Sequence, residues 1–230
     1  EAVVDLHSVL RTHVLTALFK MSGLRITRID KGRKEKRALT RKENKKFRPL
    51  SPTVSRYQAV FMKAGFPFEM VSFPGKKLYG EPKAEDVNEN NSDHPSTSPW
   101  GDLKGFTIGV APFAKHKWKM WPEEKMWALL QAINERGNGI ILFGGPGEEQ
   151  EKLEDWASKL KKANTFAGQL KMKDELRLMS QLDVMISMDS ANMHLASLAG
   201  TRVVSIWGAT HPYAGFYGYN QSPEDAVQID

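Results

Sequence analysis

The chain has 230 residues, of which 40% are hydrophobic, with a formal net charge of +6 at pH 7 and no cysteine. This size and composition suit an α/β protein with one large core or two smaller ones, and no apolar run approaches the roughly 18 residues of a membrane-spanning helix. The lack of cysteine excludes a disulfide framework and a thiolate site. The six histidines form neither a dense cluster nor a His-Glu-x-x-His pattern, so we expect no metal site.

The first part of the chain, residues 1–80, is expected to be an incomplete domain. Residues 1–6 already follow a strand pattern without an initiator methionine, and residues 226–230 end the chain without a closing helix. These two ends indicate a fragment that lacks the start of its N-terminal domain and its C-terminal end. Whether a signal peptide precedes it is therefore left open.

Residues 25–48 form a strongly basic segment. They carry 12 Lys or Arg against three acids, a net charge of +9 in a chain whose total is +6. Such a segment favours an anionic partner, which is a membrane surface, a phosphorylated glycolipid or nucleic acid. Nucleic acid is disfavoured because Phe47 is the segment's one aromatic residue. The alternative is a solvated basic loop without a partner.

Residues 82–99 are rich in Asn, Ser, Pro and acidic residues and show no apolar periodicity. This composition is typical of an exposed linker. The sequence therefore predicts a linker over residues 81–105 and a second domain over residues 106–230.

Patterns of buried strands alternate with helical patterns throughout the second domain. The strands are expected at residues 106–110, 139–143, 184–188 and 201–207. Helices are indicated by apolar residues three or four positions apart: Met126, Trp127, Leu130 and Ile133, then Leu153, Trp156 and Leu160, then Leu176, Met179 and Leu182, and finally Leu195, Leu198 and Ala199. This alternation is typical of a Rossmann-like parallel sheet with helices on both faces.

Four loops bring polar residues to one edge of this predicted sheet, at residues 111–119, 144–149, 189–194 and 208–211. Open parallel sheets bind ligands beyond the carboxyl ends of their strands, where helix N-termini attract anions. We therefore expect a phosphate and sugar site around residues 189–194. The alternative is that Asp189 or Ser190 merely caps the helix that follows.

Several common chemistries are disfavoured by the motifs. The turn at residues 144–147 lacks the Lys-Ser/Thr ending of a P-loop, and no third glycine completes a dinucleotide fingerprint. Ser190 does not lie in a Gly-x-Ser-x-Gly elbow, which argues against serine hydrolysis. No Asp-x-Asp motif suggests a divalent metal for phosphate binding.

Four blocks follow one another in a specific order over roughly the last 125 residues. They are residues 114–122 with the ending Lys-x-Trp-Pro, Leu-Phe-Gly-Gly-Pro-Gly-Glu-Glu at 142–149, Asp-Ser-x-x-x-His-Leu-Ala from 189, and Ile-Trp-Gly-Ala-Thr at 206–210. Together they resemble glycosyltransferase family 9, the ADP-heptose:lipopolysaccharide heptosyltransferases with a GT-B fold. Residues 4–7 and 10–12 show weaker similarity.

The resemblance implies roles for individual residues. Lys119 matches a lysine that faces the donor phosphate and sugar, where a compact cation offsets charge on a departing nucleoside diphosphate. Asp189 matches an aspartate that holds donor sugar hydroxyls. Ser190 and Ala191 match a turn whose N–H groups contact the pyrophosphate, and His194 faces the same cleft.

Further donor contacts follow from the same resemblance. Glu148 is expected to bind the ribose hydroxyls, although an ungapped alignment could shift that role to Gly147 or Glu149. Leu170 falls where the family places an apolar residue against adenine. The family has small or hydroxyl residues where this chain has Phe113, Ala114 and Lys115, so phosphate contacts there are expected from the Ala114 backbone or from Lys115.

Each assignment has a simpler alternative. Lys119 could be a solvated charge, His194 a satisfied helix residue, and Glu148 a residue that only favours a helix N-terminus through the dipole. Trp121 and Trp127 are expected to pack in the core, whereas Trp118 is a candidate to face the ligand.

The resemblance implies an inverting, metal-independent transfer of heptose from ADP-heptose to a lipopolysaccharide inner-core acceptor, with no cofactor beyond the donor substrate. The general base is expected outside this chain. Expected partners are the nucleotide-sugar donor, an acidic lipid-linked saccharide and an anionic membrane surface contacted by residues 25–48. The expected location is the cytoplasm, at the inner face of the inner membrane. The alternatives are another nucleotide-sugar GT-B enzyme, or a non-catalytic nucleotide-binding or nucleic-acid-binding module.

Overall fold

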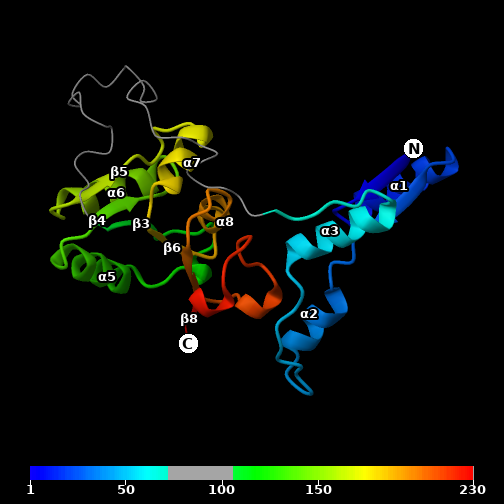
Figure 1. The fold of residues 1–230 in the computed structure, drawn as a ribbon. Helices are drawn as coiled ribbons and strands as arrows, with labels where there is room; N and C mark the ends of the chain where they lie inside the picture. The colour runs from blue at the N-terminus through cyan, green and yellow to red at the C-terminus, as the bar shows by residue number, and fades with distance from the viewer. Residues whose placement is uncertain (72–105, 230) are drawn as a thin grey trace. The chain divides into compact units, whose positions relative to one another are not determined.

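The structure is a computed structural model that describes residues 1–71 and 106–229 (Figure 1). The described residues fall into two compact units. The first consists of residues 1–71 and 212–217, and the second of residues 106–211 and 218–229. The predicted linker over residues 81–105 lies outside the described residues.

A six-stranded sheet forms the centre of the second unit. Its strands are β3 (Thr107–Ala111), β4 (Gly139–Leu142), β5 (Ala163–Thr165), β6 (Val184–Met188), β7 (Val203–Trp207) and β8 (Ala226–Gln228). The spatial order is β5-β4-β3-β6-β7-β8, and every neighbouring pair is parallel. This is the doubly wound order of a Rossmann-like domain, as the sequence predicts. The two edge strands, β5 and β8, have three residues each and were not predicted.

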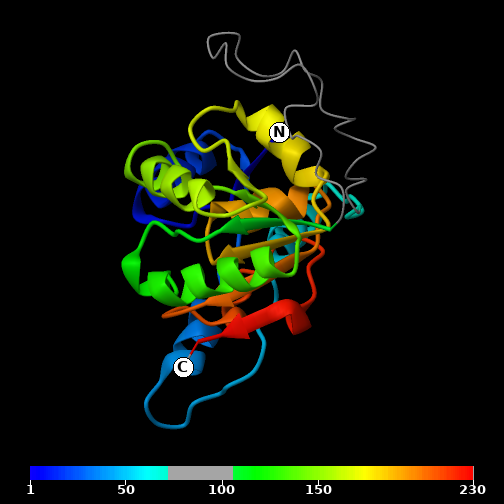
Figure 2. The same cartoon turned by 90° about the vertical axis from the view of Figure 1, so that its left-hand side faces the viewer.

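Helices cover both faces of this sheet. They are α5 (Glu123–Glu135), α6 (Glu148–Ser158), α7 (Met172–Ser180) and α8 (Ala191–Leu198). Buried residues of α5 and α6 share one apolar cluster with Ile108 and Val110, which point to one side of β3. A Cβ atom at Gly109 would point to the opposite side of the strand, where the side chains of Leu182 and Met185 lie. Figure 2 accordingly shows α5 in front of the sheet and α8 behind it.

The predicted apolar face of α5 explains why that helix packs where it does. Met126, Leu130 and Ile133 are buried, and each such side chain contributes about 1.5–3 kcal/mol relative to an exposed one. Trp127 and Trp121 are half-buried against the same cluster, so the prediction that they pack in the core is confirmed.

The first unit is built on a two-stranded parallel sheet of β1 (Ala2–Asp5) and β2 (Arg25–Arg28), joined through α1 (Leu10–Met21). The helices α2 (Arg33–Thr40) and α3 (Thr53–Ala64) follow. Residues 212–217 belong to this unit because the N–H groups of Leu50 and Thr53 each donate a hydrogen bond of 2.9 Å to the carbonyls of Tyr213 and Gly215. This strand-helix-strand unit agrees with the predicted remnant of a second Rossmann-like domain. Within the described residues, no helix is long and apolar enough to cross a membrane.

Asp5, at the end of β1, organises the turn that leads into α1. It is buried and accepts hydrogen bonds from the N–H groups of His7 (2.9 Å) and Ser8 (2.8 Å) and from the hydroxyl of Thr12 (2.9 Å). The Nε atom of Arg28 lies 3.7 Å from Oδ2 of Asp5. Burial acts to raise the pKa of Asp5, but these hydrogen bonds and the arginine outweigh it and lower the pKa below its ordinary value. The carboxylate thus acts as a fixed acceptor for the turn.

Candidate donor-binding site

The loops that follow β3 and β6 diverge at the point where the strand order of the second unit reverses. In open parallel sheets, the crevice at this switch point is the usual ligand site. Lys119 lies in a short 3-10 helix, η2 (Lys117–Lys119), after β3, and Asp189 follows β6 directly. The two residues that the sequence singled out therefore flank the switch point.

Lys119 and Asp189 form an ion pair in which Nζ lies 2.6 Å from Oδ2. The lysine side chain is 23% exposed and the aspartate side chain 8%. The hydroxyl of Thr210 donates to the same Oδ2 atom, also at 2.6 Å. Among the described residues, no donor contacts Oδ1 of Asp189. This oxygen is therefore available to accept a hydrogen bond from a ligand.

The loop after β7 is fastened to the loop that carries Lys119. The N–H of Ala209 donates a hydrogen bond of 3.0 Å to the carbonyl of Trp118. Gly208 permits this approach, because a Cβ atom there would lie 2.8 Å from the same carbonyl oxygen. Sequence reasoning placed residues 208–211 on the correct edge but gave no role to Thr210 or Gly208. The available signal was the Gly-Ala-Thr run directly after a predicted strand.

Ser190 stands at the N-cap of α8, but its side chain makes no capping hydrogen bond. Its hydroxyl instead lies 3.3 Å from that of Ser187. The carboxylate of Asp189 is likewise bonded to other loops and not to the helix. The structure therefore does not agree with the simpler alternative, in which Asp189 or Ser190 only caps α8. The first N–H groups of α8, beginning with exposed Ala191, remain suitable for an anion.

His194 lies one helical turn into α8, close enough to the ion pair to sense both charges. Partial burial lowers the pKa of His194, the negative charge of Asp189 opposes this shift, and the positive charge of Lys119 reinforces it. The net pKa is below the ordinary value, which favours a neutral imidazole at pH 7. Lys119, Asp189 and His194 thus form one electrostatic cluster.

The glycine-rich turn after β4 positions the start of α6. Gly147 has a φ of +81°, a conformation that glycine adopts without strain. Glu149 folds back so that its Oε2 accepts a hydrogen bond of 2.7 Å from the N–H of Gly145. Glu148, the first residue of α6, is exposed. Of the two glutamates considered for the ribose, Glu149 is therefore engaged in the turn and Glu148 faces solvent.

The remaining predicted donor contacts lie on loops of the second unit. Leu170 is half-buried between β5 and α7, Ala114 is half-buried after β3, and Lys115 is exposed. Trp118 is 65% exposed and stacks on His116 with ring centroids 4.7 Å apart. Its exposure leaves it able to contact a ligand. Among the described residues, no group of three or more His, Asp or Glu could hold a metal ion.

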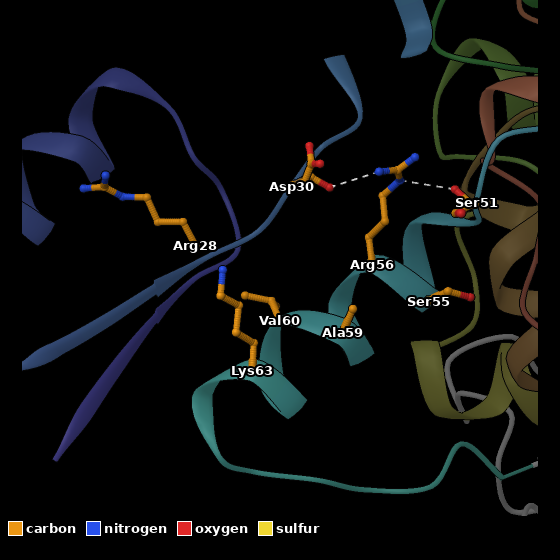
Figure 3. A pocket seen from close by; sticks show the side chains of 8 residues that line it. All are labelled: Arg28, Asp30, Ser51, Ser55, Arg56, Ala59, Val60 and Lys63. Carbon is orange, nitrogen blue, oxygen red and sulfur yellow. Dashed lines mark hydrogen bonds between the residues drawn. The ribbon is translucent and has the colours of Figure 1, made fainter. Parts of the chain in front are cut away.

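Residues of the basic segment help to line two cavities of the first unit. One, of about 320 Å³, is drawn in Figure 3 and is lined by Arg28, Asp30, Ser51, Ser55, Arg56, Ala59, Val60 and Lys63. Its Arg56 is already engaged, because it pairs with Glu35 and donates to the carbonyls of Asp30 and Ser51 (both 3.3 Å). The other, of about 230 Å³, is lined by Lys34, Glu35, Ala38, Arg41, Lys46, Arg48 and Leu50. The second cavity is the more cationic and suits an anionic group.

The doubly wound sheet, with a lysine and an aspartate paired at its switch point, defines a Rossmann-like lobe of the GT-B type. The model of glycosyltransferase family 9 (heptosyltransferase) matches residues 2–222, and the chain belongs to this family.

Individual relatives agree with this assignment. The chain is similar to lipopolysaccharide heptosyltransferase 3 of Escherichia coli K12, with 26% identity over 111 residues that make up 47% of this chain and 32% of the relative. Among solved structures, it resembles E. coli heptosyltransferase WaaC with ADP, with a TM-score of 0.64 and 17% identity over 100% of this chain and 66% of the other. A family 9 glycosyltransferase from Veillonella parvula gives a TM-score of 0.58 at 19% identity, over 92% and 54% of the two chains. The chain thus spans less than two thirds of the length of these relatives.

Proposed function

We propose that the protein transfers a heptose from ADP-heptose to a lipopolysaccharide inner-core acceptor, with inversion at the anomeric carbon and without a metal ion. The observation that carries this proposal is the cluster of Lys119, Asp189 and His194 at the switch point of the second unit. The solved relative WaaC was determined with ADP and with ADP-2-deoxy-2-fluoro heptose. Because that relative shares the fold, it supports an ADP-linked donor.

In this proposal the residues of the chain divide between the sugar and the phosphates. Oδ1 of Asp189 accepts a hydrogen bond from a donor sugar hydroxyl. The ammonium of Lys119 and the first N–H groups of α8 stabilise the diphosphate as the bond to the anomeric carbon breaks. Glu148 holds the ribose and Leu170 packs against adenine. A base outside these residues removes the proton of the acceptor hydroxyl.

The acceptor is proposed to be an acidic, lipid-linked saccharide that the first unit attracts. Residues 25–48 carry the net charge of +9, and the cavity beside Arg41, Lys46 and Arg48 gathers part of it. Cationic surfaces of this kind gain about 1 kcal/mol per Lys or Arg near an anionic membrane surface. We accordingly propose a cytoplasmic protein that associates with the inner face of the inner membrane.

Calorimetric titration with ADP-heptose, ADP and UDP tests the donor assignment. We expect both ADP ligands to bind more tightly than UDP, and Lys119→Ala and Asp189→Ala to weaken the binding of ADP-heptose. Lys117→Ala is the matched control, because this exposed lysine lies two residues from Lys119 and makes no ion pair with another described residue. Preference for UDP would assign the protein to another branch of GT-B enzymes. A gel shift at moderate salt, without binding of any nucleotide, would instead favour a nucleic-acid-binding module.

A further inference from the structure

Thr210 is the second donor to the carboxylate at the switch point. It lies three residues after β7, on the same loop as Gly208 and Ala209, and is half-buried. Its Oγ1 and the Nζ of Lys119 both bond to Oδ2 of Asp189, each at 2.6 Å. Two donors on one oxygen fix the plane of the carboxylate and direct the other oxygen, Oδ1, away from them.

The two donors differ in what else they must do. The ammonium of Lys119 is the cation assigned above to the diphosphate, so a bound donor substrate competes with Asp189 for it. The hydroxyl of Thr210 is neutral and gains much less from a phosphate than an ammonium does. Thr210 can therefore keep Asp189 in place while Lys119 moves toward the leaving group.

The backbone that carries Thr210 is held on two sides. Ala209 donates to the carbonyl of Trp118 at 3.0 Å, which ties this loop to the loop of Lys119. The amide Nε2 of Gln228 donates to the carbonyl of Gly208 at 2.9 Å, which ties it to the edge strand β8. The branched Cβ of threonine further restricts its χ1 angle. The hydroxyl is thus presented from a rigid base, as a positioning group requires.

We propose that Thr210 is a positioning residue that orients Asp189 for the donor sugar by holding Oδ2 and leaving Oδ1 to accept a sugar hydroxyl. This inference rests on the proposed function, because it takes the sugar of ADP-heptose as the partner of Oδ1. It assigns Thr210 no contact with the substrate. Its effect is on the sugar and not on the nucleotide.

Two variants separate the hydroxyl from the shape of the side chain. Thr210→Val keeps the branched shape and removes the donor, whereas Thr210→Ser keeps the donor. By calorimetry we expect Thr210→Val to bind ADP-heptose about tenfold more weakly than wild type and ADP with an affinity within about twofold of wild type. The affinity of Thr210→Ser for each ligand should stay within about threefold of wild type. The proposal is overturned if Thr210→Val weakens the binding of ADP and of ADP-heptose equally, or leaves the affinity for ADP-heptose unchanged. It is also overturned if Thr210→Ser loses as much affinity for ADP-heptose as Thr210→Val does.

Crystal structures of the ligand-free variants distinguish failure of this inference from failure of the proposed function. If wild type binds neither ADP nor ADP-heptose, the donor assignment fails, but the positioning role can still be read from the carboxylate. We expect Asp189 to turn from its wild-type orientation in Thr210→Val and to keep it in Thr210→Ser. An unmoved carboxylate in Thr210→Val contradicts the positioning role whatever the ligand.

Discussion

Lys119 and Asp189 are 70 positions apart in the chain, yet their Nζ and Oδ2 atoms lie 2.6 Å apart. The sheet brings them together because β3 and β6 are neighbours and run parallel, so that the residues after both strands reach the same edge. A charge pair at this point can serve a ligand with both an anionic part and a hydroxyl-rich part.

Asp189→Ala is expected to lower transfer of heptose by at least about 100-fold while the fold persists. The substitution removes the acceptor of the sugar hydroxyl, and the 23% exposed side chain of Lys119 can turn its ammonium to water. Initial rates of ADP release with ADP-heptose and acceptor, together with circular dichroism, measure the two effects. Asp155→Ala is the control, because this aspartate is exposed and pairs with exposed Lys159. Wild-type turnover in Asp189→Ala would remove Asp189 from the site.

Gly208→Ala is expected to separate the loop after β7 from the loop of Lys119. The new Cβ would lie 2.8 Å from the carbonyl oxygen of Trp118, and this backbone atom cannot move aside as a flexible side chain could. We expect a loss of about 1–3 kcal/mol in the free energy of unfolding and weaker binding of ADP-heptose. Urea denaturation and calorimetry measure these quantities.

Gly145→Ala provides the stability control for that experiment. A Cβ at Gly145 would meet its nearest atom, Oε2 of Glu149, at an ordinary contact distance of 3.5 Å. We therefore expect little change in its urea midpoint. If both alanine variants lose the same stability, the close approach at Gly208 is not the cause.

Glu148 and Glu149 are adjacent but should respond differently to substitution. Glu149→Ala removes the acceptor of the Gly145 N–H and is expected to cost about 0.5–1.5 kcal/mol of stability. Glu148→Ala should leave stability unchanged and reduce the preference for ADP over 2′-deoxy-ADP, which is expected to be about tenfold in wild type. Calorimetry with both nucleotides checks this. A full preference retained in Glu148→Ala would mean that another residue holds the ribose.

The position of Lys119 and Asp189 at one edge of the sheet, though not their ion pair, could be predicted, because it depends on which loops follow buried strands, and apolar runs reveal those strands. The role of Thr210 could not, because a hydroxyl's partner depends on how two loops approach each other. The inward turn of Glu149 was hidden for a similar reason: adjacent glutamates at a helix start look alike in sequence. The edge strands β5 and β8 escaped prediction because three residues show too little periodicity.

The packing of residues 212–217 in the first unit is the clearest example of a long-range feature. Backbone hydrogen bonds of Leu50 and Thr53 to Tyr213 and Gly215 join segments about 160 residues apart. The backbone hydrogen bonds do not depend on side-chain identity, and the one side-chain bond, from the hydroxyl of Thr53 to the carbonyl of Gly215, has no recognisable sequence pattern. The basic character of residues 25–48 was evident from composition, but the engagement of Arg56 with Glu35 was not.

Asp5→Asn should change the acid stability of the first unit. The folded pKa of Asp5 lies below its ordinary value of 3.8, so the ionised carboxylate stabilises the fold fully above that value. This contribution is lost as the pH falls through the lowered pKa. The measurement is amide hydrogen exchange of β1 and β2, corrected for its intrinsic pH dependence. Wild type should lose protection of these strands in acid, whereas Asp5→Asn should show the same loss already at neutral pH.

Glu69→Gln is the control for the Asp5 experiment. Glu69 is exposed in the first unit, and its neutralisation should leave protection in β1 and β2 unchanged at every pH. The interpretation fails if Asp5→Asn retains wild-type protection at neutral pH, because the buried carboxylate would then not hold the turn before α1.

The titration of His194 tests whether it belongs to the same cluster as Lys119 and Asp189. Partial burial and the charge of Lys119 lower the pKa of His194, and the charge of Asp189 raises it. We therefore expect a wild-type midpoint below 6.5, a higher midpoint in Lys119→Met, and a lower one in Asp189→Asn. Nuclear magnetic resonance of the imidazole protons measures all three, with the signal assigned by its loss in His194→Gln.

The opposite signs of these two shifts make the measurement specific. His194 is already exposed, and a general loosening of the loops would increase its solvation further in either variant. Both midpoints would then move upward, because solvation favours the imidazolium. Only direct charge coupling moves the midpoint down when Asp189 is neutralised. Lys117→Met, which removes an exposed charge nearby, should shift the midpoint far less than Lys119→Met. Shifts in the same direction for Lys119→Met and Asp189→Asn would place His194 outside the cluster and leave it as a helix residue without a part in donor binding.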